Sequence, residues 1–241
     1  MSELLGKLAL VTGASRGIGR AIAERLSSGG AKVAVHYGQS AAEAKELASK
    51  IGGLAIQADM AQPSEVRQLV ADAHQRLGGL DILVNNAGIA ILKPLDKITE
   101  DEYDRMFAVN TKGVFVALQE GARLMRDGGR IINISSGATI NGTPNGSIYC
   151  GAKAAIEQFA RSLARELGPR GITVNTVSPG FTETAMYRQF PHFAEIAPKM
   201  AALGRVGDPA DVAEVVAFLA SDSSRWLTGQ NIQASGGTNM V

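Results

Sequence analysis

A tyrosine and a lysine four positions apart are the residues of this chain that most directly suggest chemistry. Tyr149 and Lys153 stand in the segment SIYCGAK, residues 147–153. On a helix this spacing places both side chains on one face, so the Lys153 ammonium would lie beside the Tyr149 phenol and stabilise its phenolate. Because a free phenol titrates near about 10, a neighbouring cation would favour proton exchange at neutral pH. We interpret Tyr149 as the group that exchanges a proton with a substrate oxygen.

Two earlier polar residues complete a candidate catalytic set. Ser136 ends the segment NISS, where it could donate a hydrogen bond to an oxygen that becomes negatively charged. Asn110, in VNTKG, interrupts an otherwise apolar helical stretch and could hold a water that links Lys153 to solvent. The predicted catalytic residues are therefore Asn110, Ser136, Tyr149 and Lys153.

Other reactive residue types give weaker signals. A lone Tyr-x-x-x-Lys spacing also describes an exposed pair on a helix surface, which is far commoner than catalysis. Cys150 has no histidine near it in sequence, so a small helix residue explains it as well as a nucleophile does. His36, His74 and His192 are too scattered to suggest a metal site, and none is predicted.

A glycine-rich turn makes the catalytic interpretation specific. VTGASRGIG, residues 11–19, follows an apolar run and opens a helical segment, which is the context of a dinucleotide-binding turn. Gly13 would permit a sharp exit from the strand, while Gly17 and Gly19 would let a diphosphate approach the positive end of the helix. The alternative is a purely structural turn between strand and helix.

The residues after the second apolar run indicate which dinucleotide is bound. A carboxylate there would hydrogen-bond the 2′-hydroxyl of NAD and repel a 2′-phosphate. This chain has none in HYGQS, residues 36–40, and Arg16 in the glycine turn could oppose a phosphate. The pattern predicts NADPH/NADP+ as cofactor; the alternative is that Arg16 is solvated and cofactor choice is open.

Further polar signals follow the third and fourth apolar runs. Asp59 could accept a hydrogen bond from the adenine amino group, although an Asp after a strand is as often a turn or helix cap. In NNAG, residues 85–88, Gly88 would let the backbone approach the nicotinamide ribose.

Seven short apolar runs provide the elements that must position these residues. They alternate with amphipathic helical segments, as a parallel sheet covered on both faces requires. This predicts a single-domain α/β fold over residues 1–241, a doubly wound parallel seven-stranded sheet (Rossmann fold) with helices on both faces and a ligand crevice at the strands' carboxyl ends. The predicted strands are residues 7–11, 32–37, 54–57, 82–85, 130–134, 172–177 and 231–234.

The alternation lapses over residues 181–205, where aromatic and methionine side chains accompany Pro191 and Pro198. We interpret the segment as a substrate lid, since such side chains in a mobile segment can close over a ligand. The alternative is two short helices packed on the body or on a neighbouring subunit.

Composition points to a small-molecule partner. The 241 residues carry a formal net charge of +1 with no basic stripe, so neither nucleic acid nor an anionic membrane is an expected partner. No window approaches the roughly 20 apolar residues of a membrane span, and the N-terminal segment lacks a signal pattern. With one cysteine in the sequence, these features favour a cytoplasmic location.

Taken in order, the motifs resemble the short-chain dehydrogenases/reductases over nearly the whole chain. VTGASRGIG, NNAG, Asn110, Ser136 with YCGAK, and SPGFTETAM at 178–186 carry the likeness, which is greatest to bacterial 3-oxoacyl-acyl-carrier-protein reductases and related carbonyl reductases. The resemblance implies a catalytic tetrad, a homotetramer, Lys153 on the nicotinamide ribose, and Thr184 with the turn at Pro179 and Gly180 at the nicotinamide end.

The motifs and the resemblance together imply a set of cofactor-binding residues spread along the chain. They are Gly13, Ser15, Arg16, Gly17, Ile18, Gly19, Tyr37, Ser40, Asp59, Met60, Asn86, Ala87, Gly88, Tyr149, Lys153, Pro179, Gly180, Thr182 and Thr184.

Two departures leave the substrate open. Carrier-protein reductases resemble one another in basic side chains near the cleft; Arg170 matches this, but Asp127 stands where a second base is expected. The ending QASGGTNM also differs from the family's frequent Asp-Gly-Gly.

We therefore expect NADPH-dependent reduction of a ketone, whether a 3-oxoacyl thioester, a β-ketoester or another carbonyl. One alternative is an NAD(P)-linked dehydrogenase that oxidises a sugar or secondary alcohol. The other is a non-catalytic dinucleotide sensor or scaffold, which would be expected to lack the Tyr, Lys or Ser.

Overall fold

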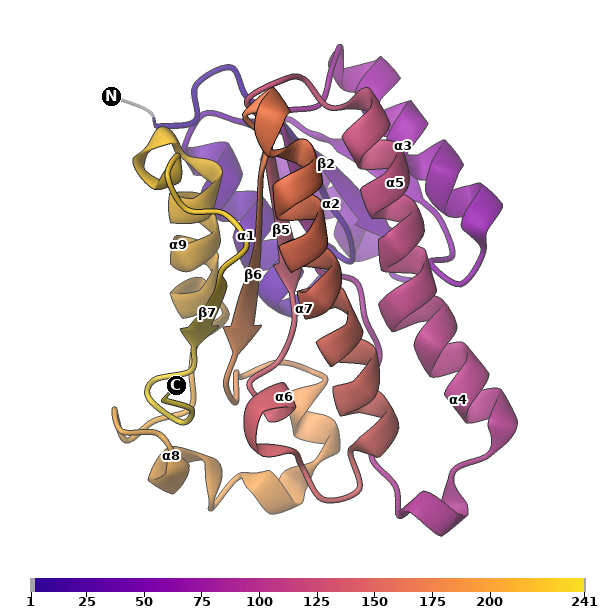
Figure 1. Ribbon diagram of the computed structural model, residues 1–241, viewed down its shortest axis with the longest axis vertical. Helices are drawn as coiled ribbons and strands as arrows, with labels where there is room; N and C mark the ends of the chain where they lie inside the picture. Colours follow the sequence, from indigo (N-terminus) through magenta and orange to yellow (C-terminus); the bar gives the residue numbers. More distant parts are fainter. Residues whose placement is uncertain (1–2, 241) are drawn as a thin grey trace.

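A seven-stranded, all-parallel sheet forms the centre of the computed structural model, which describes residues 3–240 (Figure 1). The strand order is β3-β2-β1-β4-β5-β6-β7, which confirms the predicted doubly wound sheet. The strands are β1 (Leu8–Val11), β2 (Lys32–Tyr37), β3 (Leu54–Gln57), β4 (Ile82–Asn85), β5 (Arg130–Ile134), β6 (Thr173–Pro179) and β7 (Asn231–Ala234). β6 runs two residues beyond the predicted end at Val177, because its pairing with β7 continues through Ser178 and Pro179.

Helices cover both faces of the sheet. One face is covered by α1 (Gly17–Ser28), α2 (Ala41–Lys50) and α9 (Pro209–Ala220). The other is covered by α3 (Pro63–Leu77), α5 (Val114–Leu124) and α7 (Ser147–Leu167), which stand in front of the sheet in Figure 1.

The strands are apolar on both sides because each side packs under a helical layer. In β1, Ala9 and Val11 belong to the core under α1 and α9, whereas Leu10 belongs to the core under α3 and α5. β4 alternates in the same way. Fully burying one such Leu or Val contributes about 1.5–3 kcal/mol, so continuous apolar strands are what this architecture requires.

Several shorter elements connect these layers. α4 (Glu100–Phe107) begins at a capping box between Thr99 and Glu102, and a π-helical turn, η2 (Ala108–Gly113), joins it directly to α5. The remaining short helices are η1 (Leu95–Lys97), α6 (Ala138–Asn141), η3 (Gly168–Arg170), η4 (Tyr187–Gln189), η5 (Pro191–Phe193), α8 (Ala197–Met200) and η6 (Asp222–Ser224).

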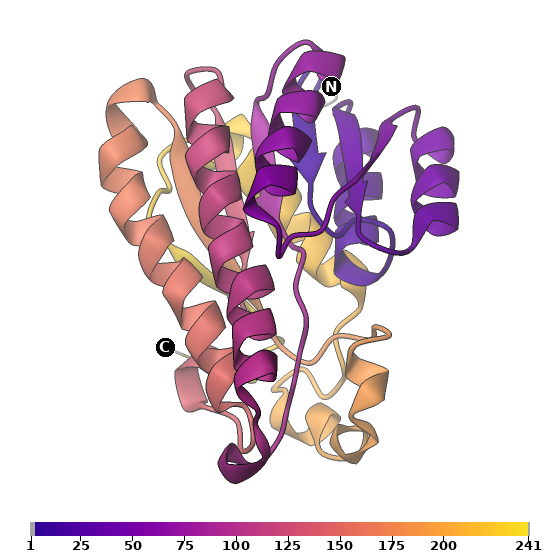
Figure 2. The ribbon, with the colours of Figure 1, turned by 90° about the vertical axis from the view of Figure 1, so that its right-hand side faces the viewer.

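The winding direction reverses between β1 and β4, so the loops that leave these two strands diverge at the carboxyl edge. In Figure 1 this edge faces down, where the β6 arrow points towards α6 and α8. Figure 2 shows the segment of residues 181–205 in orange at the same end of the molecule. Over the described residues 3–240, we find no helix with the length and apolarity to cross a membrane.

Candidate active site

A cavity of about 900 Å³ opens at the carboxyl edge of the sheet. Its lining comes from loops after β1, β2, β3, β4, β5 and β6, from α7 and from residues 181–205. The size is that of a ligand site. Most residues predicted from the sequence line it: Gly13, Ser15, Arg16, Gly17, Ile18, Gly19, Ser40, Asp59, Met60, Asn86, Ala87, Gly88, Ser136, Tyr149, Lys153, Pro179, Gly180, Thr182 and Thr184.

The structure places Tyr37 away from this cavity, contrary to the cofactor contact expected of it. Its side chain is buried in the core with Val33 and Val35. Because side chains alternate along a strand, Tyr37 shares the face of these valines, and the neighbouring His36 takes the other side. Gly38 and Gln39 line the cavity in its place.

Asn110 is fully buried in the π-helical turn and also lies outside the lining. Its Oδ1 accepts a hydrogen bond from the Ile89 amide at 2.9 Å, and its Nδ2 donates to the Ile89 carbonyl at 2.8 Å. The amide therefore fixes the backbone next to Gly88, and a water held by Asn110 stays a prediction. This contact explains why a polar residue interrupts the apolar helix.

Three of the predicted catalytic side chains meet at one wall of the cavity. The Ser136 hydroxyl lies near enough to the Tyr149 phenol to affect its pKa, and its Oγ accepts from the Ala138 amide at 3.2 Å. Lys153 is buried, and its Nζ donates to the carbonyl of Ile134, the last residue of β5, at 2.8 Å. The end of β5 and the first turns of α7 thus hold the serine, the phenol and the amine as one group.

Burial dominates the acid–base behaviour of this group. It raises the pKa of Tyr149, against a smaller lowering by the hydrogen bond from Ser136. Burial also lowers the pKa of Lys153 to about 8, while the negative charge of Glu157 acts to raise it. The sequence predicts that Lys153 lowers the phenol's pKa; in the structure the net direction is upward, so Tyr149 is a protonated acid at neutral pH.

The glycine turn forms a cradle that side chains would fill. Gly13 has φ +62°, and a Cβ there would lie 2.8 Å from the Ala87 Cα. A Cβ on Gly19 would lie 2.3 Å from the Gly13 carbonyl oxygen and 2.4 Å from Asn86 Nδ2. That Nδ2 donates to the carbonyls of Thr12 at 2.9 Å and Gly13 at 3.0 Å, which ties the ends of β1 and β4 together.

The same cradle fits a dinucleotide diphosphate. α1 begins at Gly17 with no side-chain cap at Arg16, so amide groups of its first turn remain as donors. Arg16 is exposed, lines the cavity, and has no ion pair or side-chain hydrogen bond within residues 3–240. Its guanidinium is therefore available to a ligand on the side of Gln39 and Ser40.

His36 supports this turn, a role that the sequence analysis missed. Its buried ring accepts a hydrogen bond from the Gly13 amide on Nδ1 at 2.9 Å, and its Nε2 lies 3.0 Å from the Ala58 carbonyl. These partners require the neutral ring with the proton on Nε2. Burial lowers the pKa of His36, which agrees with that form. A polar residue inside an apolar strand is the signal that could have revealed it.

Asp59 is a turn cap in the structure, and its contact with the adenine amino group stays a prediction. Its Oδ1 accepts from the Ala61 amide at 2.9 Å, as a turn cap does, and its Oδ2 pairs with Arg105 at 3.1 Å. The hydrogen bond from Arg105 is the main cause that lowers the pKa of Asp59. The carboxylate still lines the cavity.

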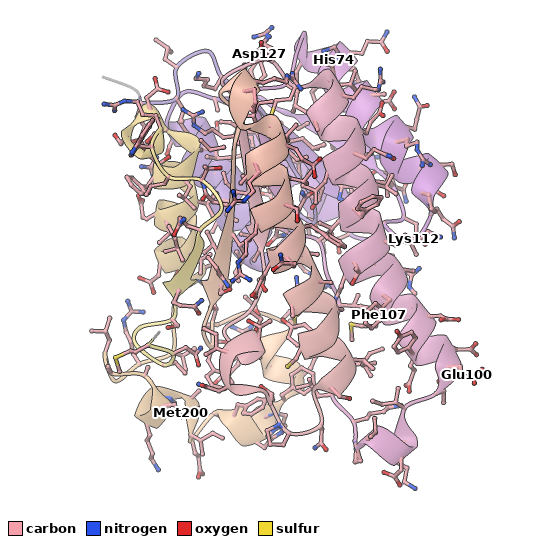
Figure 3. The ribbon with its side chains drawn as sticks, in the orientation of Figure 1. His74, Glu100, Phe107, Lys112, Asp127 and Met200 are labelled. Atoms are coloured by element: carbon pink, nitrogen blue, oxygen red, sulfur yellow. The ribbon has the colours of Figure 1, made fainter. Side chains whose placement is uncertain are left out.

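Residues 181–205 form an aromatic wall of the cavity. The ring centroids of Phe181 and Phe193 lie 4.9 Å apart, those of Phe181 and Tyr187 lie 6.2 Å apart, and all three residues line the cavity. The segment also contains the short helices of the alternative interpretation, η4, η5 and α8. Met200, labelled in Figure 3, lies at the end of α8.

The end of the described chain also lines the cavity, beside the 181–205 segment, because the Leu203 amide donates to the Gly236 carbonyl at 3.0 Å. Asn141 Nδ2 donates to Asn239 Oδ1 at 2.6 Å, and both residues line the cavity with Thr143 and Thr238.

Arg170 does not supply a free basic group at the cleft. It pairs with Asp127 at 2.8 Å and donates to the carbonyls of Ala122 and Met125. Figure 3 shows Asp127 at the end of the molecule opposite Met200, away from the carboxyl edge. Across residues 3–240, histidine, cysteine and acidic side chains form no group of three or more that could hold a metal ion.

Comparisons with known proteins agree with this geometry. A family model described as enoyl-(acyl carrier protein) reductase matches residues 13–239. Versicolorin reductase stcU of Emericella nidulans is 43% identical over 254 residues, covering 98% of this chain and 96% of that protein.

Two solved structures are similar along their whole length. A short chain dehydrogenase from Burkholderia cenocepacia in complex with NADP has a TM-score of 0.96 and 43% identity, covering 99% of this chain and 100% of that one. The angucycline C-6 ketoreductase LanV with bound NADP has a TM-score of 0.93 and 46% identity, covering 98% and 96%.

Proposed function

The chain belongs to the short-chain dehydrogenase/reductase family, and we propose that it is an NADPH-dependent reductase that converts a ketone into a secondary alcohol. The observation that carries the proposal is the group of Ser136, Tyr149 and Lys153 in the same cavity as the glycine turn. The three side chains supply hydrogen-bonding and proton-donating groups, and the glycine turn supplies a dinucleotide site.

NADPH would be held by the glycine turn, with Arg16 opposing the 2′-phosphate and Gly88 and Gly180 beside the nicotinamide end. When bound, NADPH supplies the hydride that reduces a carbonyl carbon. NADP in the two similar structures supports this choice of cofactor.

The chain's own residues manage the substrate oxygen. Ser136 donates a hydrogen bond to that oxygen as negative charge develops, and Tyr149 donates the proton. Lys153, with a pKa of about 8, remains mostly charged at neutral pH and stabilises the phenolate left on Tyr149. Asn110 acts from outside the cavity by fixing the backbone at Ile89. A water route that returns the proton through Lys153 stays a prediction.

The direction of the Tyr149 pKa shift is compatible with the proton-donor role proposed here. Oxidation needs the phenolate as a base, whereas reduction needs the protonated phenol. Because burial raises the pKa of Tyr149, the protonated phenol predominates at neutral pH.

The cavity walls support a cyclic ketone fused to an aromatic body. Phe181, Tyr187 and Phe193 offer ring faces to the cavity, and the Asn141–Asn239 pair offers polar groups to it. The similar angucycline C-6 ketoreductase is named for the reduction of a ketone, which agrees with a ketone substrate. An acidic carrier protein is less favoured, because Arg170 is paired at the opposite edge.

Substrate preference is tested by NADPH consumption. We expect bicyclic aromatic ketones to give a higher kcat/KM than β-ketoesters, acetoacetyl thioesters or sugars, because their rings can stack on the aromatic wall. An enoyl thioester belongs in the panel, because the matching family model is described as an enoyl reductase. Consumption with the enoyl thioester and with no ketone would refute carbonyl reduction.

Cofactor choice is tested through Arg16. We expect Arg16→Ala to raise the KM for NADPH by about 10- to 100-fold while changing that for NADH little, because a charge-assisted hydrogen bond contributes about 1.5–3 kcal/mol. Arg20→Ala is the matched control: it lies one turn further along α1 and pairs with Glu24 and Glu46 instead of lining the cavity. A wild-type kcat/KM with NADH equal to that with NADPH would contradict the assignment.

Residues 181–205 are proposed to close over the substrate. Their two ends are tied together, because Thr182 and Gly207 form a bridge and the Gly207 amide donates to the Phe181 carbonyl at 2.8 Å. A segment anchored at a common base can move as one unit and exclude water.

We also propose a cytoplasmic homotetramer. Phe115 on α5 and Tyr103 on α4 are 48% and 46% exposed, and another subunit could cover these apolar side chains. The single cysteine, Cys150, is free, which suits a reducing compartment.

A further inference from the structure

A buried carboxyl group lies one helical turn beyond Lys153, and the reaction proposed above does not use it. Glu157 on α7 is 9% exposed and is the only acidic residue that is buried within residues 3–240. Side chains four positions apart share one face of a helix, so Glu157 lies on the Lys153 face. Burying a carboxylate is costly unless it is hydrogen-bonded and paired, so its partners indicate why it is there.

The hydroxyl partners of Glu157 lie on either side of the catalytic serine. Ser135 Oγ donates to Glu157 Oε1 at 2.5 Å, and Thr139 Oγ1 lies 2.7 Å from the same oxygen. Thr139 also approaches the Ser136 carbonyl: its hydroxyl oxygen lies 2.8 Å from that oxygen, and its amide donates to it at 3.1 Å. The carboxyl group therefore joins both ends of the turn at residues 135–139 to α7, with Ser136 between the two contacts.

The same carboxyl group acts on the catalytic amine. The Lys153 ammonium has Tyr149 and Glu157 as ionisable neighbours on α7, and Cys150 lies next to Tyr149. From the other packed elements it meets the Ile134 carbonyl of β5 and, beside Gly88, the uncharged amide of Asn110. Within residues 3–240, Glu157 is the one negative charge that acts on it, and this charge opposes the effect of burial on the pKa of Lys153.

We propose that Glu157 is a positioning residue, which fixes Ser136 and Lys153 relative to one another by clamping the 135–139 turn onto α7 and by facing the ammonium. The role in catalysis rests on the proposed reductase function. The clamp itself rests only on the contacts of Ser135, Thr139 and Glu157. If Glu157 had only a structural role, it would hold the 135–139 turn in place without influencing kcat or the pH dependence of kcat.

Glu157→Gln tests this proposal, because the amide keeps the size and loses the charge. We expect backbone amides of residues 135–140 to exchange hydrogen about tenfold faster, as a loosened turn would, and those of α1 to be unchanged. We expect kcat to fall about tenfold, since a small misplacement of reacting groups is costly, with the KM for NADPH unchanged. The alkaline decline of kcat should begin at lower pH, because the ammonium loses the charge that stabilises it.

Glu166→Gln is the matched control, since Glu166 lies on α7 but is exposed. It should change none of the three measurements. If Glu157→Gln does not fold, Thr139→Val and Ser135→Ala remove one contact each and should speed exchange in the same turn.

The outcomes separate this proposal from the reductase function. Unchanged exchange at residues 135–140 overturns the clamp, whatever the activity. Faster exchange with unchanged kcat and pH profile overturns the positioning role and leaves only a structural one. Faster exchange in a protein that reduces no ketone supports the clamp and refutes the proposed function.

Discussion

Replacing Tyr149 with phenylalanine is expected to lower kcat for ketone reduction by about a thousandfold, within the usual range for loss of a general acid. The phenyl ring keeps the shape of the side chain but cannot donate the proton that the substrate oxygen needs. The dinucleotide cradle is formed by the glycine turn and Asn86, so NADPH should still bind. Steady-state rates and a fluorescence titration with NADPH measure the two effects separately.

Tyr103→Phe provides the control for this substitution. Tyr103 is 46% exposed on α4, stacks on Phe107 with ring centroids 4.5 Å apart, and does not line the cavity. Loss of its hydroxyl should leave kcat unchanged. Near-normal turnover in the Tyr149 variant would remove the phenol from the mechanism.

Replacing Gly19 with alanine is expected to weaken NADPH binding by about a hundredfold or more, which corresponds to about 2.7 kcal/mol. The new Cβ would lie 2.3 Å from the Gly13 carbonyl oxygen and 2.4 Å from Asn86 Nδ2, so the turn must shift. That shift separates Asn86 from the Gly13 carbonyl and deforms the diphosphate cradle. Calorimetric titration with NADPH measures the loss.

Gly168→Ala is the control that separates the steric clash of a new Cβ at Gly19 from any general effect of replacing glycine with alanine. Gly168 follows α7 with a helical φ of −51°, and a Cβ there would have no atom within 4 Å. We expect unchanged NADPH affinity and a melting temperature equal to or slightly above that of the wild type, because alanine favours helix. If Gly19→Ala binds NADPH as tightly as this control, the dinucleotide does not occupy the glycine turn.

The sheet could be predicted from the sequence because its signal is local. Each strand is a short apolar run between polar or glycine residues, and the two helical layers bury both its sides. The pairing of Tyr149 with Lys153 could likewise be predicted, since helical spacing alone places both side chains on one face. The position of Ser136 at the site could be predicted because it follows a strand, and the carboxyl ends of parallel strands lie at one edge of the sheet.

Residues whose roles depend on distant contacts escaped prediction. His36 meets Gly13 and Ala58, and Glu157 meets Ser135 and Thr139, across separations of 18 to 23 residues. Tyr37 was assigned to the cofactor although the alternation of its strand turns it into the core.

The direction of the Tyr149 pKa shift also depends on packing. Spacing shows that a cation is near the phenol, but it does not show how deeply the phenol is buried. Desolvation proves to be the larger influence and acts in the opposite direction.

The most direct test of the central claim uses NADPH deuterated at the transferable position of its nicotinamide ring, with a bicyclic aromatic ketone as substrate. Carbonyl reduction at the Ser136–Tyr149–Lys153 group predicts an alcohol with a single deuterium on the carbinol carbon, formed by the wild type and not by Tyr149→Phe. Deuterium on the carbon β to an intact carbonyl, as hydride addition to a conjugated double bond would give, or the same labelled alcohol from both proteins at equal rates, would contradict it.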